Sequence, residues 1–287
     1  MKISLISLFI VLITTFPCAG EDAREIARAM LDRDDGTTEI GRVTLSTCSI
    51  GKKGKKLVCT GAPRVKVMDL IRKDYGPREK DHKTVTIILE PAAERGIGFL
   101  QYDYEKKGKE TDQWLYLSAL GKVKRIVSGN ENEPKTGSFF GSELSYEDME
   151  KRQIDDFTYT FLGRETYAKR NCAVIQAIPT RERAPKTNYS KVIYWVDTDR
   201  DMALKTILYS RQGKKFKQIY YTRITRIDNI LVPMKIIVFN LESMRRTDMS
   251  YERATFNRPV QDEFLTQRTL TDGAFREMNL KTYQAGF

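Results

Sequence analysis

The chain of 287 residues carries 49 Lys and Arg against 38 Asp and Glu, a formal net charge of +11, and 40% of its residues are hydrophobic. This allows one sizeable core and does not require two domains. A single histidine and four cysteines, with no Cys-x-x-Cys spacing, argue against a metal site. The basic clusters lie in or beside predicted turns, and we expect solvated charges there and no nucleic-acid partner; attraction to an anionic membrane surface or an acidic partner is the alternative.

An export signal is predicted at the start of the chain. A short positive region and an apolar run fill residues 1–16, and small residues up to Gly20 precede two acidic ones. We expect a cleaved signal peptide over residues 1–20, one mature domain over 21–287, and a periplasmic location. A lipid anchor on Cys18 is the alternative, but the Thr-Phe-Pro before it departs from what a lipoprotein signal peptidase requires.

The first structured element is predicted to be a helix over residues 22–33. Its apolar residues recur on one helical stripe, at Ala23, Ile26, Ala27, Met30 and Leu31. Asp22 and Glu25 suit its start, and Gly36 suits a stop soon after it.

Strands dominate the next hundred residues. Runs with period-two alternation between turn residues predict strands near 41–49, 56–61, 64–72, 84–90, 97–104, 113–118 and 122–127. Cys48 and Cys59 lie on either side of a Gly-Lys-Lys-Gly turn, so they can form a disulfide across that hairpin or stay as two thiols. Cys172 is left over in either case.

The most distinctive stretch runs from Trp114 to Glu150. Its first part is a predicted β-hairpin that turns at Gly121 and carries an aromatic rung. An apolar Phe-Phe-Gly plug follows, and then a short helical turn over 146–150, which Ser142, or Ser145 paired with Asp148, can cap.

The second half repeats the strand pattern. Strands are predicted near 156–163, 171–179, 190–197, 203–210, 215–227, 231–241 and 248–257. Short connections between them indicate an antiparallel meander, because parallel strands need crossover helices. Near the end, Asn257-Arg258-Pro259 predicts a helix start, and the tail beyond Gly273 is weakly patterned.

The sequence contains little that could perform catalysis. His82, the only histidine, lies in a charged segment read as a turn, so any catalytic triad would stand on a loop tip. The Asp-rich segment 197–201 lacks the glycine and the twelfth acidic residue of a calcium loop and is better read as a turn between strands. We therefore expect no catalytic residues, no cofactor and no enzyme activity.

A binding function remains. A curled antiparallel sheet that does not close leaves an inner face to be filled by side chains, helices or a ligand. The candidate cavity residues are large aromatics, with the last three as a lid: Phe99, Trp114, Tyr116, Trp195, Phe139, Phe140 and Tyr146. Plain core packing is the alternative for each, because alternation defines two faces without telling which one is concave.

The stretch WLYLSALGKVKRI followed by FFGSELSYED resembles the LolA-like family of periplasmic outer-membrane lipoprotein-sorting proteins, as do Asp32–Gly36 and Tyr194–Asp197. Ser118 stands where that family usually has Pro, and Leu144 where it usually has Phe. The resemblance implies a mainly β fold, a half-open antiparallel β-barrel covered by a few short α-helices.

The resemblance also implies a function. It is a carrier that takes acyl chains of lipoproteins or free lipid into an apolar cavity and moves them across the periplasm towards the outer membrane. The branch with this aromatic strand and plug implies, as the alternative, an accessory subunit that docks on an inner-membrane exporter of the resistance-nodulation-division type.

Overall fold

The computed structural model describes residues 21–54, 56–129 and 133–286. The predicted signal peptide, residues 1–20, lies outside the described residues and stays a prediction. Among the described residues, no helix is long and apolar enough to cross a membrane.

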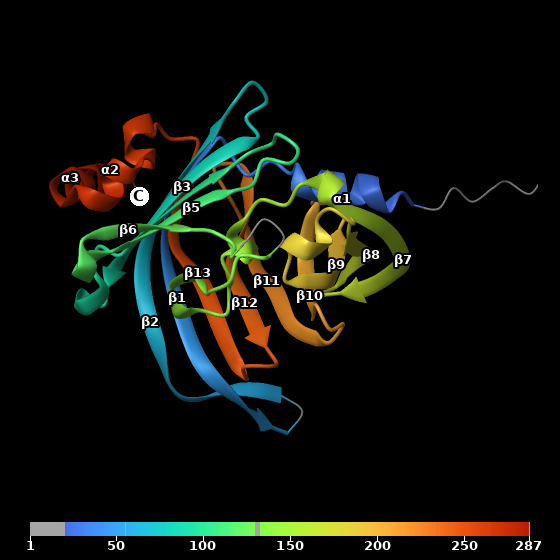
Figure 1. The fold of residues 1–287 in the computed structure, drawn as a ribbon. Helices are drawn as coiled ribbons and strands as arrows, with labels where there is room; N and C mark the ends of the chain where they lie inside the picture. Colours follow the sequence, from blue (N-terminus) through green and yellow to red (C-terminus); the bar gives the residue numbers. More distant parts are fainter. Residues whose placement is uncertain (1–20, 55, 130–132, 287) are drawn as a thin grey trace, which may run out of the picture.

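The described chain folds around one curled antiparallel sheet of thirteen strands (Figure 1). In space the strands follow the order β6-β5-β4-β3-β2-β1-β13-β12-β11-β10-β9-β8-β7, so β6 and β7 are edges that do not pair with each other. The strands are β1 (Thr38–Lys53), β2 (Lys56–Tyr75), β3 (Asp81–Glu90), β4 (Gly98–Asp103), β5 (Asp112–Leu117), β6 (Lys122–Ile126), β7 (Phe157–Tyr167), β8 (Arg170–Pro179), β9 (Tyr189–Asp197), β10 (Met202–Ser210), β11 (Lys215–Ile227), β12 (Ile230–Asn240) and β13 (Arg245–Phe256). The predicted mainly β, half-open barrel is confirmed.

The long hairpin of β1 and β2 differs from the prediction of two separate strands near 56–61 and 64–72. These segments form one strand because a bulge at Cys48 sets a single β1 residue against the stretch containing Pro63. Since β2 pairs with β3 only from Val67 onward, the proline costs no ladder hydrogen bond on that side. Cys48 and Cys59 form a disulfide in this hairpin, with 5.7 Å between their Cα atoms.

Helix α1 (Ala23–Leu31) lies where the stripe predicted it. The Asp22 carboxylate accepts from the backbone N–H groups of Arg24, at 2.8 Å, and Glu25, which caps the helix. The buried Ala23 and Ala27 face the inner side of the sheet, near its β7–β8 end in Figure 1.

The predicted helix start at Pro259 is wrong. The chain is irregular there, and the α-helices come later, as α2 (Gln267–Thr271) and α3 (Gly273–Gln284). The Asp272 carboxylate accepts from the Phe275 N–H at 2.9 Å and caps α3, a helix in the tail that sequence patterning missed. Its apolar side chains contact the outer face of the sheet, and this tertiary packing explains a helix with weak periodicity.

The two faces of the sheet have separate cores. On β3, Val85, Ile87 and Leu89 pack with α2 and α3 on the outer face, whereas Ile88 belongs to the inner core. The inner core also contains α1 and the segment 137–150, which we call the plug. In Figure 1 the plug crosses the concave side and α2 and α3 lie outside. Successive side chains of β3 therefore point to opposite faces of the sheet, and each face is covered by a different part of the chain.

Candidate functional site: the inner face and its plug

The plug covers the inner face without forming a regular element. It contains two short 3-10 turns, Phe139–Gly141 and Glu147–Met149, joined by an isolated bridge between Ser138 and Ser145. Phe140 has φ of 50°, a left-handed conformation that is costly for a bulky side chain. The second turn is capped as predicted, because Ser145 N–H donates to the Asp148 carboxylate at 2.8 Å and Asp148 N–H donates to Ser145 Oγ at 3.2 Å.

An aromatic cluster anchors one side of the plug to β4. The Phe99 ring lies 5.3 Å from Phe139, 6.3 Å from Phe140 and 5.7 Å from Tyr146, between centroids. All four side chains are buried. The structure therefore brings four of the seven predicted cavity residues together.

The other three predicted residues lie elsewhere. Trp114 and Tyr116 pack with the core beneath α2 and α3, because on β5 it is Leu115 that packs against the inner core. Trp195 belongs to a third cluster, where its Nε1–H donates to Glu165 at 2.7 Å and the Lys205 ammonium lies 3.6 Å from its ring. The alternation was read correctly, but which side was concave could not be inferred from it.

Acidic side chains hold the other side of the plug to strands β9, β11, β12 and β13 and to the loop between β8 and β9, and we call these contacts the latches. The Glu143 carboxylate accepts from Arg245 at 3.0 Å and from the Asn240 amide at 2.8 Å. Glu147 accepts from the Asn188 amide at 2.7 Å and pairs with Arg183 at 3.3 Å. These acids went unnoticed in the sequence because nothing there pairs them with partners some 40 to 100 residues away.

The most buried latch joins Asp148 to Lys217. Their side chains are 3% and 4% exposed, and Tyr189 donates its hydroxyl to the same carboxylate. Burial alone would raise the pKa of Asp148, but the charge and hydrogen bond of Lys217 outweigh it, so the pKa lies below its ordinary value of 3.8. Burial, together with the neighbouring Asp148, raises the pKa of the Tyr189 hydroxyl well above 10.0. The Asp148 carboxylate of this latch is therefore ionised at neutral pH.

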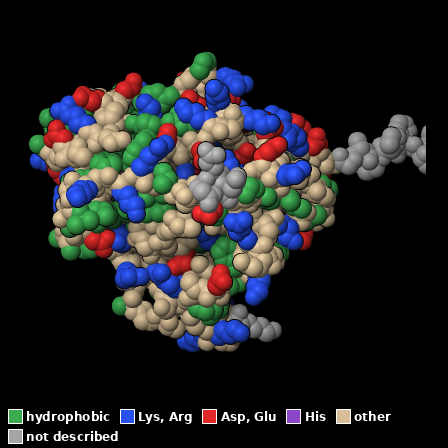
Figure 2. Space-filling model, viewed as in Figure 1, with side chains coloured by type: hydrophobic (Ala, Val, Ile, Leu, Met, Phe, Trp, Pro, Cys, Tyr) green, Lys and Arg blue, Asp and Glu red, His purple; other side chains and the backbone are tan. Residues whose placement is uncertain are grey.

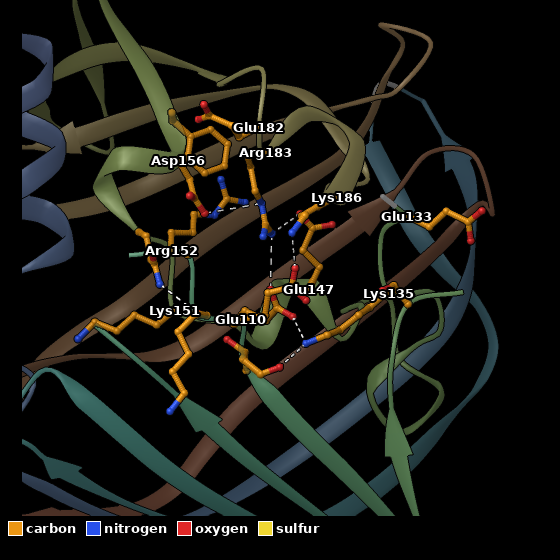
Figure 3. Close-up of a pocket in the computed structure, with 17 residues that line it drawn as sticks. Glu110, Glu133, Lys135, Glu147, Lys151, Arg152, Asp156, Glu182, Arg183 and Lys186 are labelled. Carbon is orange, nitrogen blue, oxygen red and sulfur yellow. Dashed lines mark hydrogen bonds and ion pairs between the residues drawn. The ribbon is translucent and has the colours of Figure 1, made fainter. Parts of the chain in front are cut away.

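Three cavities border the plug. The largest of them is about 470 Å³ and is lined by Ser142, Ser145 and Tyr189, among others, and two are smaller. One, of about 130 Å³, is lined mostly by charged residues, some of which pair with one another, as Lys135 with Glu150 and Arg183 with Asp156 (Figure 3). The other, of about 290 Å³, opens beside Phe140 between Leu45 and Val65. Its walls are partly apolar. We call this cavity the mouth, because it opens towards solvent beside the aromatic residues of the plug.

His82 is buried in β3 and not on a loop tip as predicted, because the β2–β3 hairpin extends to Tyr75 and Asp81 and takes it into the sheet. Its Nδ1 lies 2.8 Å from the Asp74 carboxylate and 3.1 Å from an Arg72 nitrogen. Segment 197–201 is the predicted turn, between β9 and β10. Among the residues described, no group of three or more His, Cys, Asp or Glu side chains could hold a metal ion.

Comparisons with known proteins agree with this architecture. A family model described as that of an uncharacterized protein matches residues 80–272, more than half of the chain. No curated protein sequence matches the chain.

Solved structures give the fold. A DUF1329 family protein from Desulfovibrio piger has a TM-score of 0.74 and 21% identity, covering 86% of this chain and 97% of its own. A putative outer membrane lipoprotein-sorting protein domain from Vibrio parahaemolyticus has a TM-score of 0.74 and 23% identity, with 87% and 98% covered. A LolA superfamily protein from Nitrosomonas europaea has a TM-score of 0.59 and 19% identity, with 85% and 97% covered.

Proposed function

Since the chain belongs to the DUF1329 family of uncharacterized proteins and has a LolA-like fold, we propose that it is a carrier of acyl chains. The chains of lipoproteins or of free lipid would occupy the inner face of the sheet in place of the plug. Transfer then needs no bond to be made or broken and no cofactor. The carrier would load at the inner membrane and release its cargo towards the outer membrane.

The observation that carries this proposal is the nature of the inner cover. A curled sheet whose inner side chains are apolar is covered there by an irregular segment, held by aromatic contacts at one side and by latches at the other. A segment with two 3-10 turns can leave the sheet without unfolding any strand. Displacing it exposes apolar side chains of the sheet, among them Phe99, Leu45, Met68 and Ile88. These side chains form a wall that suits an acyl chain.

The energetics of this exchange favour reversible binding. An acyl chain gains about 0.8 kcal/mol per buried methylene, while displacing the plug loses the burial of its aromatic rings. These two contributions have opposite signs, so cargo can be held and still be released to a better acceptor. A deep, permanently open apolar cavity would hold its cargo more tightly.

A periplasmic location supports the same proposal. The predicted signal peptide would export the chain, and the Cys48–Cys59 disulfide suits an oxidising compartment. Leu45 and Val65, at the mouth beside Phe140, precede and follow the cysteines in the same hairpin.

Native mass spectrometry tests the proposal. Mature protein is released gently from the periplasm without detergent, and any added mass is extracted with solvent. We expect an adduct that extracts as a lipid or an acylated peptide, and uptake of a fluorescent acyl probe by the delipidated protein. A clean apo mass together with no probe uptake would reject the carrier.

Docking on an inner-membrane exporter is a second candidate, favoured by the end of the β1–β2 hairpin. This end projects from the molecule and exposes Lys52, Lys53 and Lys56 (Figure 2). An acidic surface of a partner would suit it. Salt separates the two functions, because docking through exposed charges weakens steeply with ionic strength, whereas an acyl chain in an apolar site stays bound.

A further inference from the structure

A further cavity lies at the rim of the sheet, away from the mouth beside Phe140. We call it the rim cavity; it measures about 600 Å³ and is bounded by α1, the β2–β3 turn, the β4–β5 loop and residues 151–155. This volume suits a small ligand or a lipid headgroup. Seven Lys and Arg residues but only four acidic residues line it.

The acids of the rim cavity are already engaged. Asp32 pairs with Lys80 at 2.9 Å, Glu105 pairs with Arg78 at 2.9 Å, and Asp155 pairs with Arg24. Asp81 accepts from the Glu105 N–H at 2.7 Å. The acidic residues that line the rim cavity therefore do not neutralise all of its Lys and Arg charges.

Arg152 is the most unusual of the cations. Its guanidinium lies 5.5 Å from the Phe157 ring, 5.9 Å from Tyr189 and 5.7 Å from Tyr194, and it donates one hydrogen bond, to the Tyr194 hydroxyl at 2.6 Å. No carboxylate of the described residues forms an ion pair with it. A guanidinium has five N–H donors, so most of those of Arg152 remain for a ligand.

Neighbouring groups complete an anion site. Gln153 donates to the carbonyl oxygens of Tyr104 at 3.0 Å and Lys109 at 3.3 Å, which fixes the β4–β5 loop beside Arg152. That loop carries Lys106 and Lys107, which are exposed and have no ion pair within the described chain. Lys151, also in the lining, donates to the Lys80 carbonyl at 3.2 Å.

We propose that the rim cavity binds a phosphate-bearing headgroup, with Arg152 as its central ligand and Lys106 and Lys107 closing over it. Phosphate matches a guanidinium fork and ammonium groups together. Leu31 and Ile154 give the same cavity an apolar wall, and Ile154 also packs against the inner core, so a headgroup here could continue into an acyl chain. This inference deepens the carrier proposal and rests on it for the identity of the cargo.

The test measures binding of three probes by calorimetry: short-chain phosphatidic acid, neutral dioctanoylglycerol and glycerol 3-phosphate. We expect Arg152→Gln to weaken phosphatidic acid binding about tenfold and to reduce the preference for phosphatidic acid over dioctanoylglycerol. The paired change Lys106→Gln with Lys107→Gln should weaken it severalfold. The matched control is Lys52→Gln with Lys53→Gln, which removes the same charge from the distant hairpin and should have no effect.

Each outcome decides a separate point. Equal affinity for phosphatidic acid and dioctanoylglycerol, or unchanged binding in both variants, would overturn the anion site. Glycerol 3-phosphate binding as tightly as the lipid would identify a free phosphate ester, and binding of the lipid alone would identify a headgroup. Arg152-dependent binding of glycerol 3-phosphate without any lipid uptake would reject the carrier and keep the anion site. If Arg152→Gln fails to fold by circular dichroism, the exposed lysine pair decides.

Discussion

The two faces of the sheet are covered in different ways. On the outer face, α2, α3 and the 3-10 turn before them, Asp262–Leu265, place Leu270, Leu280 and Phe264 in an apolar core with almost no exposure. On the inner face, the plug combines an aromatic cluster with buried ionic latches and has almost no regular secondary structure. Both covers exclude water, but only the outer one resembles an ordinary permanent core.

The difference indicates which cover can move. Buried ion pairs contribute little net stability, because desolvation offsets their attraction, yet they define one geometry sharply. A plug fixed in this way has a single closed position and a modest cost of opening. The outer helices would have to lose their whole apolar contact to leave the sheet.

The largest effect is expected from the outer cover. Phe264→Ala removes a fully buried ring and should lower the free energy of unfolding by about 3–5 kcal/mol. Uptake of the acyl probe per folded molecule should not rise, since the inner face is unchanged. Chemical denaturation and probe titration measure the two quantities. A rise in uptake would mean that the outer helices, and not the plug, guard the cavity.

The next effect concerns the latch. Lys217→Met leaves Asp148 buried without its partner and should cost about 3 kcal/mol, while uptake of the acyl probe increases. The double variant with Asp148→Asn removes both charges and should recover part of the stability, which a double-mutant cycle quantifies. A cost below about 1 kcal/mol for Lys217→Met would show that the pair does not hold the plug.

A smaller effect is expected from the aromatic side of the plug. Phe140 is 9% exposed and borders the mouth, and Ala also fits a left-handed φ poorly, so Phe140→Ala should cost about 2–3 kcal/mol. Unlike Phe264→Ala, it should also raise probe uptake. Unchanged uptake with lowered stability would return Phe140 to plain core packing.

The smallest effect is a pH dependence. The pKa of Asp148 is lower in the folded protein than its ordinary value of 3.8. The contribution of Asp148 to the free energy of unfolding is therefore complete above pH 3.8 and is lost as the pH falls below that value. Burial raises the pKa of Glu150, which acts in the opposite direction, so the comparison must be with Asp148→Asn. Thermal melts at a series of pH values should show that this variant loses less stability in acid than the wild type. If the melting temperatures of the two proteins fall in parallel as the pH is lowered, the result would argue against the latch.

Much of the fold could be predicted from the sequence, because strands and their turns are local patterns. The β5–β6 hairpin, α1 and the Ser145–Asp148 cap follow from neighbouring residues. Helix α3 could not be predicted in this way, since its amphipathic pattern is weak and its stability comes from packing on β3. His82 was misplaced because a charged strand end resembles a turn.

The candidate site was predicted only in part. Phe99, Phe139, Phe140 and Tyr146 meet because the plug folds back on β4, and the predicted plug captured that. Trp114 and Tyr116 share a strand with inward residues but point to the other face, which depends on how the whole sheet curls. The latches and the rim cavity join distant segments, and no local pattern signals such pairs.

Hydrogen–deuterium exchange with and without an acyl ligand tests the central claim most directly. In the closed plug, Phe139 N–H donates to the Leu144 carbonyl at 2.8 Å and Glu143 N–H donates to Thr247 Oγ1 at 2.9 Å, so these amides should be protected. We predict that bound acyl ligand accelerates exchange in residues 137–150 and leaves α2 and α3 unchanged. Ligand binding with equal or slower exchange in the plug would contradict the account.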